Sequence, residues 1–423
     1  MSKWTAFLLA IFANVCLVTA ADIPRDWIDA DTGHRIIRLS DVDGSRTLYF
    51  HDNSYTPDGD KLIFNTPKGV AVVDITQLGA TPTQMKIIAQ GANAIMARRT
   101  REVYIRLPQA GGVLGGPIVA VNVGTGTFRQ IPNAVSTIIN CDETFNFIVE
   151  RGAVDPTGKT PRPATRPVVP QLQRMFPGKT MADLTPQQQY SVQKEDQLAR
   201  RAINPSPAAY TFINLKTGER KTTGYQYGDL DHQQWSPTDP NLLLYAHEGS
   251  WHEVDRTWTI RSDGSDMKLM HKRTMDMEIN GHEWWSFDGK TIWYDLQTPR
   301  SQDFWIGGVN IDTNKETRYH ITRDSWGVHF NSSRDNTMFA DDGGDPSQVA
   351  YSNDGMWINL FNVEPDGTVT REKLVNMSKH NYVTGRGGIE PNVSITPDKK
   401  WVIYTGNMFG GNQVFAVEVA KAK

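Results

Sequence analysis

The chain has 423 residues, and 39% of them are apolar, which is enough for one large domain or for two or three ordinary ones. Its formal net charge is −3, with 44 basic and 47 acidic residues. A nucleic-acid-binding protein usually carries a cationic face, so this balance predicts no nucleic-acid partner.

The first 20 residues have the pattern of a signal peptide. Lys3 precedes an apolar core at residues 7–18, and Val18-Thr19-Ala20 offers small residues for cleavage. The alternative is a membrane anchor, but the apolar stretch is shorter than the roughly 20 residues that span a bilayer, and Asn14 interrupts it. We expect a single domain at residues 21–423, a periplasmic or secreted protein, and no membrane attachment after cleavage.

A turn containing Pro, Asp or Gly, followed by an alternating apolar strand, recurs along the chain. The clearest copies lie at residues 56–64, 236–245, 286–294 and 396–404, and weaker copies lie at 97–105, 141–149 and 333–339. A second strand–turn–strand motif follows most copies, with Thr-Gly or Asp-Gly at the turn, which is typical of hairpins. Each unit then has about four strands over roughly 40 to 50 residues, the period of a β-propeller.

The pattern therefore predicts an all-β fold, a seven-bladed β-propeller. Two β-sandwiches are the alternative, but they do not predict the same turn and strand seven times. A ring must join its ends to remove open sheet edges. We expect the early strand at residues 34–39 to complete the final blade beside the last strand at residues 415–419.

Residues 151–207 interrupt the repeat between the third and fourth units. The part from 155 to 170 is rich in Pro and basic residues, whereas the part from Pro186 to Arg201 has helix formers, with Thr185 as the expected N-cap. Long insertions in compact domains are often functional. This one is either a surface elaboration or a lid over one face of the propeller.

Histidines recur at similar places in the units. His232, His282 and His329 precede the fourth, fifth and sixth turns, and Glu390 occupies the matching point before the seventh. Equivalent positions of successive blades converge around the central channel, so we expect one cavity lined by these four residues. The alternative is a structural ring of hydrogen bonds between blades.

Several of these sequence segments resemble those of the oligogalacturonate lyases. The resemblance is carried by residues 216–220, His232, residues 247–249, residues 254–256 and residues 282–285, and it is densest from residue 208 to residue 345. It implies a seven-bladed propeller that cleaves acidic, uronate-containing oligosaccharides by β-elimination in pectin degradation. It also implies a divalent metal such as manganese.

The implied metal site departs from the family pattern. The resemblance implies His282 as one ligand, but Gly387, Glu390 and Asn392 stand where the family has a Gln-x-x-His-x-His cluster. Oxygen donors favour hard cations. We expect His282, Glu390 and Asn392 to hold Mn²⁺ or Ca²⁺, with loss of the metal as the alternative.

The resemblance also implies catalytic roles. His232 matches the family's base, which takes the C5 proton of the uronate, and His247 is the second candidate; Arg201 and Arg256 are candidates for neutralising the substrate carboxylate. The residues expected to contact the substrate are His329, Asn331, Trp284 and Arg220, although Trp284 has packing in the core as its alternative. A non-catalytic periplasmic propeller that binds a glycan or a protein partner is the competing function.

Overall fold

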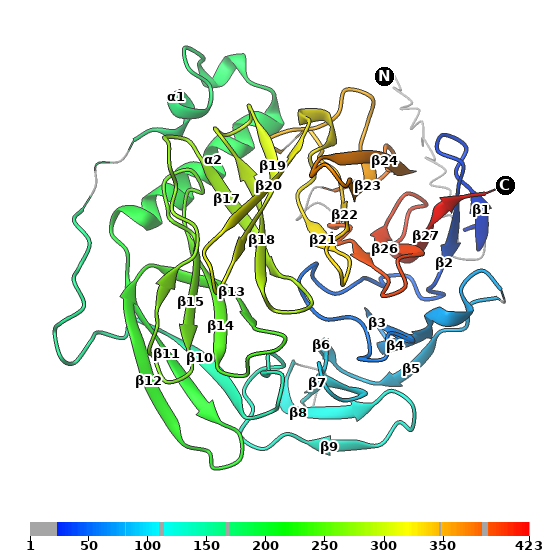
Figure 1. The fold of residues 1–423 in the computed structure, drawn as a ribbon, viewed down its shortest axis with the longest axis horizontal. Helices are drawn as coiled ribbons and strands as arrows, with labels where there is room; N and C mark the ends of the chain where they lie inside the picture. The colour runs from blue at the N-terminus through cyan, green and yellow to red at the C-terminus, as the bar shows by residue number, and fades with distance from the viewer. Residues whose placement is uncertain are drawn as a thin grey trace, which may run out of the picture.

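In the computed structural model, the chain forms a ring of seven small antiparallel sheets (Figure 1). The structure describes residues 23–422 except 81, 110–113, 166, 168, 347 and 383–387. Within these residues the seven-bladed β-propeller prediction is confirmed. The predicted signal peptide, residues 1–20, lies outside the described residues.

The first four blades have three or four strands each. Blade 1 contains β3 Lys61–Thr66, β4 Gly69–Asp74 and β5 Lys86–Ala89, and blade 2 contains β6 Ala92–Met96, β7 Glu102–Pro108, β8 Leu114–Asn122 and β9 Phe128–Gln130. Blade 3 contains β10 Phe145–Arg151, β11 Pro207–Asn214 and β12 Arg220–Tyr227, and blade 4 contains β13 Asp229–Trp235, β14 Leu242–Glu248, β15 Thr257–Arg261 and β16 Lys268–Leu269.

The last three blades have four or five strands. Blade 5 contains β17 Ile279–Trp285, β18 Thr291–Gln297, β19 Phe304–Asn310 and β20 Glu316–Ile321, and blade 6 contains β21 Phe330–Ser332, β22 Met338–Asp341, β23 Trp357–Val363 and β24 Val369–Asn376. Blade 7 contains β25 Ser394–Ile395, β26 Trp401–Gly406, β27 Gln413–Lys421, β2 His34–Arg38 and β1 Asp26–Ile28. Short 3₁₀ turns lie at Ile75–Gln77, Met181–Asp183 and Arg323–Ser325.

The middle strands are buried on both faces because each blade packs between two neighbours. All six residues of β26 are buried, as are six of the seven residues of β18. Leu244 of blade 4 and Tyr294 of blade 5 belong to one apolar cluster, and Ile358 of blade 6 packs with Tyr404 of blade 7. The core is therefore a series of layers between blades, and burying such large side chains is the main stabilising term.

The repeated turns occupy equivalent places in all seven blades. In each blade, a backbone N–H at the turn donates to the carbonyl at the start of the next strand. The donors are Thr56, Ala97, Asn140, Ser236, Ser286, Ser333 and Thr396. These residues give a common reference point from which positions in different blades can be compared.

The ring closes as predicted. Strand β2 pairs with β27, with Ile36 opposite Val417 and Arg38 opposite Phe415, so residues from the two ends of the described chain share blade 7 (Figure 1). Closure removes the open edges that blade 7 would otherwise expose.

The insertion between β10 and β11 carries two helices, α1 Gln171–Met175 and α2 Pro186–Ile203. The Thr185 hydroxyl accepts a hydrogen bond from the backbone N–H of Gln188, which confirms the predicted N-cap. Both helices lie at one end of the ring beside blade 5 (Figure 1). Among the described residues, neither helix has the length and apolar character needed to cross a bilayer.

Candidate active site

One position recurs in every blade, four residues before the turn reference. In chain order it is occupied by Asp52, Asn93, Ser136, His232, His282, His329 and Asn392. The three predicted histidines therefore do occupy equivalent places. The prediction for blade 7 was wrong, because Asn392 holds the equivalent position and Glu390 lies two residues before it.

A β-bulge turns this position out of the strand ladder. His232 and His282 have φ values of 53° and 47°, and the pairing register shifts between Asp231 and Gln234 and between Gly281 and Trp284. Asn392 has a φ of 48°. Left-handed backbone is uncommon for histidine, and such backbone persists where the surroundings hold it, often at functional sites. The same register shift and a φ of 54° occur at the equivalent Asn93 of blade 2, so this conformation belongs to the blade repeat, and it turns the side chain at this position out of the regular strand pattern.

The histidines gather around the channel with a segment from the start of the chain. The ring centroids of His282 and His329 are 4.5 Å apart, and those of His232 and His282 are 6.4 Å apart. Phe50 lies 5.0 Å from His329, and His51 lies 6.0 Å from His232. The expected convergence of the three histidines is thus present in the structure.

Burial keeps two of these imidazoles neutral. It lowers the pKa of His282 well below the ordinary value, and the charge of His329 lowers it further. Burial also lowers the pKa of His232, to which the positive charge of Arg256 adds. The ring of His232 hydrogen-bonds to no described residue, and its Nε2 lies 3.8 Å from a Glu248 oxygen. A neutral imidazole with an uncommitted nitrogen is able to accept a proton.

His329 differs from the other two. Its Nδ1 donates to the Asp342 carboxylate at 2.8 Å. Burial alone would lower its pKa, but the Asp342 charge outweighs burial, and the net pKa is raised. Only 1% of His329 is exposed. The predicted contact with substrate is not available in this structure, because His329 is buried beside His282 and bound to Asp342.

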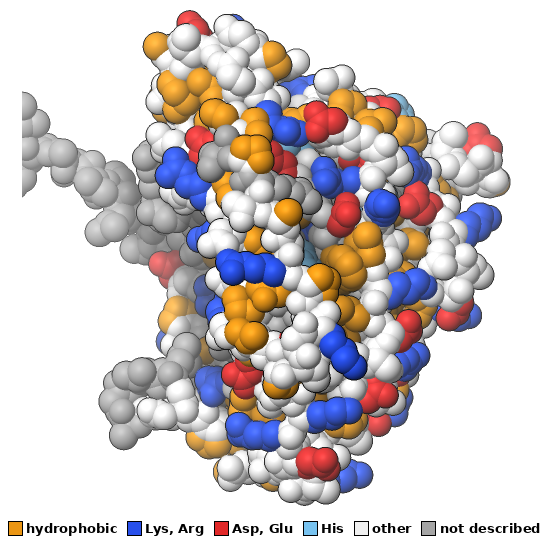
Figure 2. Space-filling model, turned by 90° about the vertical axis from the view of Figure 1, so that its left-hand side faces the viewer, with side chains coloured by type: hydrophobic (Ala, Val, Ile, Leu, Met, Phe, Trp, Pro, Cys, Tyr) orange, Lys and Arg blue, Asp and Glu red, His pale blue; other side chains and the backbone are white. Residues whose placement is uncertain are grey.

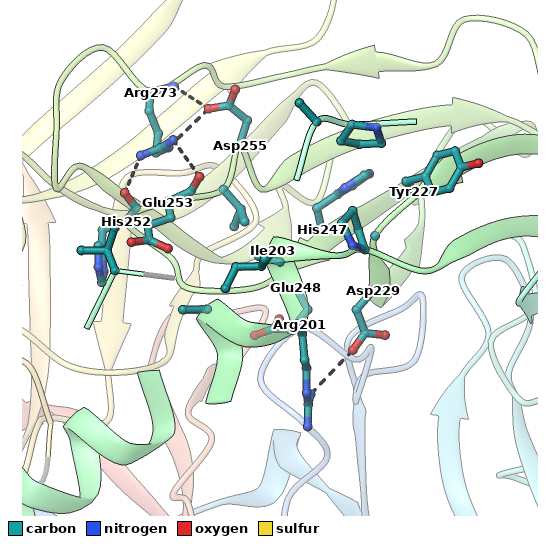
Figure 3. Close-up of a pocket in the computed structure, with 18 of the residues that line it drawn as sticks. Arg201, Ile203, Tyr227, Asp229, His247, Glu248, His252, Glu253, Asp255 and Arg273 are labelled. Atoms are coloured by element: carbon teal, nitrogen blue, oxygen red, sulfur yellow. Dashed lines mark hydrogen bonds and ion pairs between the residues drawn. The ribbon is translucent and has the colours of Figure 1, made fainter. Parts of the chain in front are cut away.

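His247 lies at a different place. It lines a cavity of about 550 Å³ together with Arg201, Asp229 and His252 (Figure 3). Its Nε2 lies 2.7 Å from the side-chain oxygen of Gln226, and burial lowers its pKa to about 4. The hydrogen bond to Gln226 fixes the ring, which leaves His232 as the better candidate for the base.

Arg256 does not face a substrate carboxylate. It is completely buried, lies 2.6 Å from Glu248 and 2.8 Å from Glu283, and stacks over the Trp251 ring at 4.6 Å. Two carboxylates already balance its charge. These contacts give no support to its predicted role as the substrate-binding cation, which stays a prediction. Its positive charge lowers the pKa of the Glu248 carboxyl against the effect of burial, and Glu248 lies beside His232.

The other two predicted arginines lie outside the histidine cluster. Arg201, in the last turn of α2, is 3.6 Å from Asp229 on the wall of the larger cavity (Figure 3). Arg220 is exposed at the start of β12 beside the hairpin turn, at the opposite end of that strand from Tyr227, which lines the larger cavity. The prediction for Arg220 is wrong, because the resemblance around it reflects a hairpin.

Trp284 and Asn331 are structural. Trp284 is 2% exposed, donates to Ser332 and stacks on Phe330, so its predicted contact with a sugar ring is wrong and packing is its role. The Asn331 amide donates to the Phe50 carbonyl and accepts from the Ile395 backbone N–H. Because both ends of this amide are engaged, Asn331 joins blades instead of contacting substrate.

A sequence model of the oligogalacturonate lyase family matches residues 202–422. The chain belongs to this family. It is 27% identical over 215 residues to an oligogalacturonide lyase of Pectobacterium atrosepticum (49% of this chain, 54% of the relative) and 28% identical over 220 residues to an oligogalacturonate lyase of Dickeya dadantii (49% and 54%). The chain thus spans about half the length of the curated relatives it matches.

Solved structures of oligogalacturonate lyases share the fold of this family member. One, described as in complex with manganese, superposes with a TM-score of 0.67 at 20% identity, covering 94% of this chain and 96% of the other. Another, from Vibrio parahaemolyticus, gives a TM-score of 0.67 at 18% identity with the same coverage. The likeness extends over the N-terminal blades, which the family's sequence model does not match.

A second, smaller cavity in this family member holds two of the three predicted metal ligands. It has a volume of about 190 Å³ and is lined by His282 and Glu390. The Nδ1 of His282 is buried and has no hydrogen-bond partner among the described residues, so it is available to a cation. The Asn392 side-chain oxygen, in contrast, accepts from the Phe50 N–H at 3.1 Å. In the described part of the chain, no three His, Cys, Asp or Glu side chains converge as a preformed metal site.

Sequence reasoning missed two contributors to this cluster. The segment Tyr49–His51 enters between the blades, and His51 is buried there with its pKa lowered well below the ordinary value, first by burial and then by His232. Trp251 packs against His282 at 4.7 Å. The same offset, counted back from the first turn at Thr56, would have pointed to residues 51 and 52. Trp251 could not be found in this way, because it lies in a loop outside the repeated pattern.

Proposed function

We propose that this protein is a lyase that cleaves oligogalacturonate or a similar acidic oligosaccharide by β-elimination, as part of pectin degradation. Membership of the oligogalacturonate lyase family supports the reaction class. The observation that carries the proposal is His232, a neutral imidazole with a free ring nitrogen beside the cavity of His282 and Glu390.

The reaction follows from the acidity of a uronate. The C5 proton lies next to the carboxylate, and His232 takes it as general base. The electron pair of that C–H bond forms the C4–C5 double bond while the bond from C4 to the glycosidic oxygen breaks, and the leaving oxygen takes a proton from solvent. Glu248, 3.8 Å from the His232 ring, stabilises the imidazolium that forms.

Negative charge develops on the uronate carboxylate as the proton leaves. His282 and Glu390 are the residues that would hold a divalent cation, Mn²⁺ being the ion that their nitrogen and oxygen donors suit. Such an ion would supply charge neutralisation at that carboxylate. Arg256 takes part indirectly, because it keeps Glu248 ionised.

The test is to incubate purified protein with trigalacturonate, with and without added Mn²⁺, and to follow the ultraviolet absorbance of the unsaturated product. We expect turnover by the wild type and a loss of about 10²- to 10⁴-fold in His232→Ala, the usual contribution of a general base. His320→Ala is the control, since the exposed His320 contacts Asp303 and the Trp305 ring in blade 5, away from the histidine cluster. Full activity in His232→Ala would remove it as the base.

A glycan- or protein-binding propeller without catalysis is the second candidate. The observation that favours it is the incomplete ligand set, in which the Asn392 oxygen is already engaged. Absence of product from galacturonate, glucuronate and mixed oligomers under all metal conditions would decide for this alternative.

We also propose that the protein is exported and works in the periplasm or outside the cell as one domain from residue 21. The composition of residues 1–20 supports this proposal. N-terminal sequencing of the protein recovered from cell fractions tests it. An intact Met1 in the cytoplasmic fraction would overturn it.

A further inference from the structure

Helix α2 forms one wall of the cavity that contains His282. Tyr190, Lys194 and Leu198 line it from the helix, and His282 and Glu390 line it from blades 5 and 7. The insertion therefore covers part of the candidate site, which favours the lid over a mere surface elaboration. At about 190 Å³ the cavity is smaller than most ligand pockets, which take roughly 300 to 1,000 Å³, and it suits a single sugar ring.

Helix α2 is held at this place by buried polar contacts. Glu195 lies 2.7 Å from the Arg300 guanidinium and accepts a hydrogen bond from the Ser250 hydroxyl at 2.9 Å. Its neighbour Lys194 is thereby placed at the mouth of the cavity, on the same helical turn. The position of Lys194 is thus defined by the propeller as well as by the insertion.

Among the residues that the structure describes, the arginines near the cavity are already paired, whereas Lys194 is not. Arg300 is paired with Glu195, and Arg256 is paired with Glu248 and Glu283. Lys194 forms no ion pair with any described residue, although it lines the cavity. An exposed ammonium over a pocket, with no carboxylate of the protein bound to it, is suited to a carboxylate supplied by a ligand.

Lys194 shares its cavity with the histidine cluster. Lys194, from helix α2, and His282, from blade 5, line the same cavity, with Glu390 of blade 7 as a further lining residue. A ligand bound there can therefore contact the ammonium and the imidazole together.

We propose that Lys194 binds the carboxylate of one uronate ring in the His282 cavity, and that it makes the enzyme select free acids over esterified sugars. This proposal rests on the proposed lyase function, and it assigns the residue that recognises the substrate carboxylate. Neither Arg256, which is buried and paired, nor Arg201, which lines the other cavity, is free to do this here. Lys194 acts in substrate binding, so its loss should affect KM more than kcat.

Three variants test the assignment: Lys194→Met, Lys194→Arg, and the control Lys179→Met, which removes an exposed lysine from the same insertion away from the cavity. With trigalacturonate, we expect KM to rise at least tenfold in Lys194→Met with kcat within threefold of the wild type. Lys194→Arg should recover most of the loss, and Lys179→Met should match the wild type. Thermal unfolding of each variant checks that it folds.

Methyl-esterified trigalacturonate provides the matched substrate. Because the ester has no charge to pair with Lys194, the wild type and Lys194→Met should treat it alike. A KM for the free acid within threefold of wild type in Lys194→Met would overturn the proposal, as would a fall in kcat with unchanged KM.

The two proposals fail in different ways. No turnover by the wild type would overturn the lyase function alone, and Lys194 is then tested by calorimetric titration with digalacturonate. Binding by the wild type and Lys179→Met that weakens at least tenfold in Lys194→Met would support the carboxylate site. Equal binding by all three, or no binding by the wild type, would overturn it.

Discussion

At the scale of single residues, the candidate base has an environment that should be visible in the pH dependence of the reaction. Burial and Arg256 lower the pKa of His232 from its ordinary value of 6.5. A general base works only when deprotonated, so kcat/KM should be constant at neutral pH and should fall as the pH drops through a value below 6.5. A pH–rate profile of the wild type measures this limb.

The matched variant for that profile is Glu248→Gln. Removing the carboxylate removes a charge that favours the protonated imidazole, so the acidic limb should move to still lower pH. An acidic limb above pH 6.5 in the wild type would contradict the assignment of His232 as the base.

Arg256 should matter for stability because it is completely buried between two carboxylates. Replacing it by Met leaves Glu248 and Glu283 without their cation, and breaking a buried pair in this way costs about 3 to 5 kcal/mol. We expect a correspondingly lower free energy of unfolding in denaturant titrations of Arg256→Met. The control is Arg220→Ala, since Arg220 is exposed and such changes stay within about 0.5 kcal/mol. Equal stability of the two variants would show that the buried carboxylates find other partners.

At the scale of secondary-structure elements, helix α2 is joined to blade 5 by a buried ion pair. The Glu195 and Arg300 side chains are 12% and 7% exposed and lie 2.7 Å apart. In Glu195→Ala we expect amide hydrogen exchange across residues 186–203 to become faster, because the helix opens locally, while exchange in β26 stays unchanged. Gln193→Ala, an exposed position on the same helix, is the control. Unchanged exchange in α2 would mean that the other contacts of the helix hold it without this ion pair.

The elements also show which features were readable from the sequence. The turns and their hairpins predicted seven blades because Ser, Thr, Asp and Gly make local hydrogen bonds that recur whatever the distant contacts are. The α2 N-cap at Thr185 was readable for the same reason. The histidines of blades 4 to 6 followed from their constant offset to those turns.

Other features depended on contacts that no local pattern records. Asn392, not Glu390, holds the equivalent position because the offset is counted from the turn hydrogen bond of Thr396, and residue type alone does not reveal that register. From the sequence alone, Arg256 was a candidate for binding an anionic substrate. In the structure it pairs with Glu283, which comes from the next blade. Packing between blades likewise decided that Trp284 belongs to the core.

At the scale of the whole molecule, the site depends on closure of the ring. The segment Tyr49–His51 follows β2, and β2 is fixed by its pairing with β27 from the other end of the chain. The Phe50 backbone N–H donates to the side-chain oxygen of Asn392, and the Phe50 carbonyl accepts from the side-chain amide of Asn331. Blades 6 and 7 and the channel segment are therefore organised together, and opening the ring should disturb the histidine cluster as well as the fold.

Two truncations distinguish the effect of opening the ring from the effect of shortening the chain. Removing residues 21–39 deletes β1 and β2 and leaves β27 with an unpaired edge, which favours association with other chains. We expect this variant to aggregate, or to unfold at a clearly lower temperature, when followed by light scattering and circular dichroism. Removing only residues 21–29 deletes β1 together with Ile23 and Trp27, which pack on the core of blades 6 and 7, but leaves β2 paired with β27. We expect this variant to be monodisperse and folded, with a smaller loss of stability than the longer truncation. If both truncations behaved like the full domain, the pairing of β2 with β27 would not be what holds the ring closed, and blade packing alone would have to account for it.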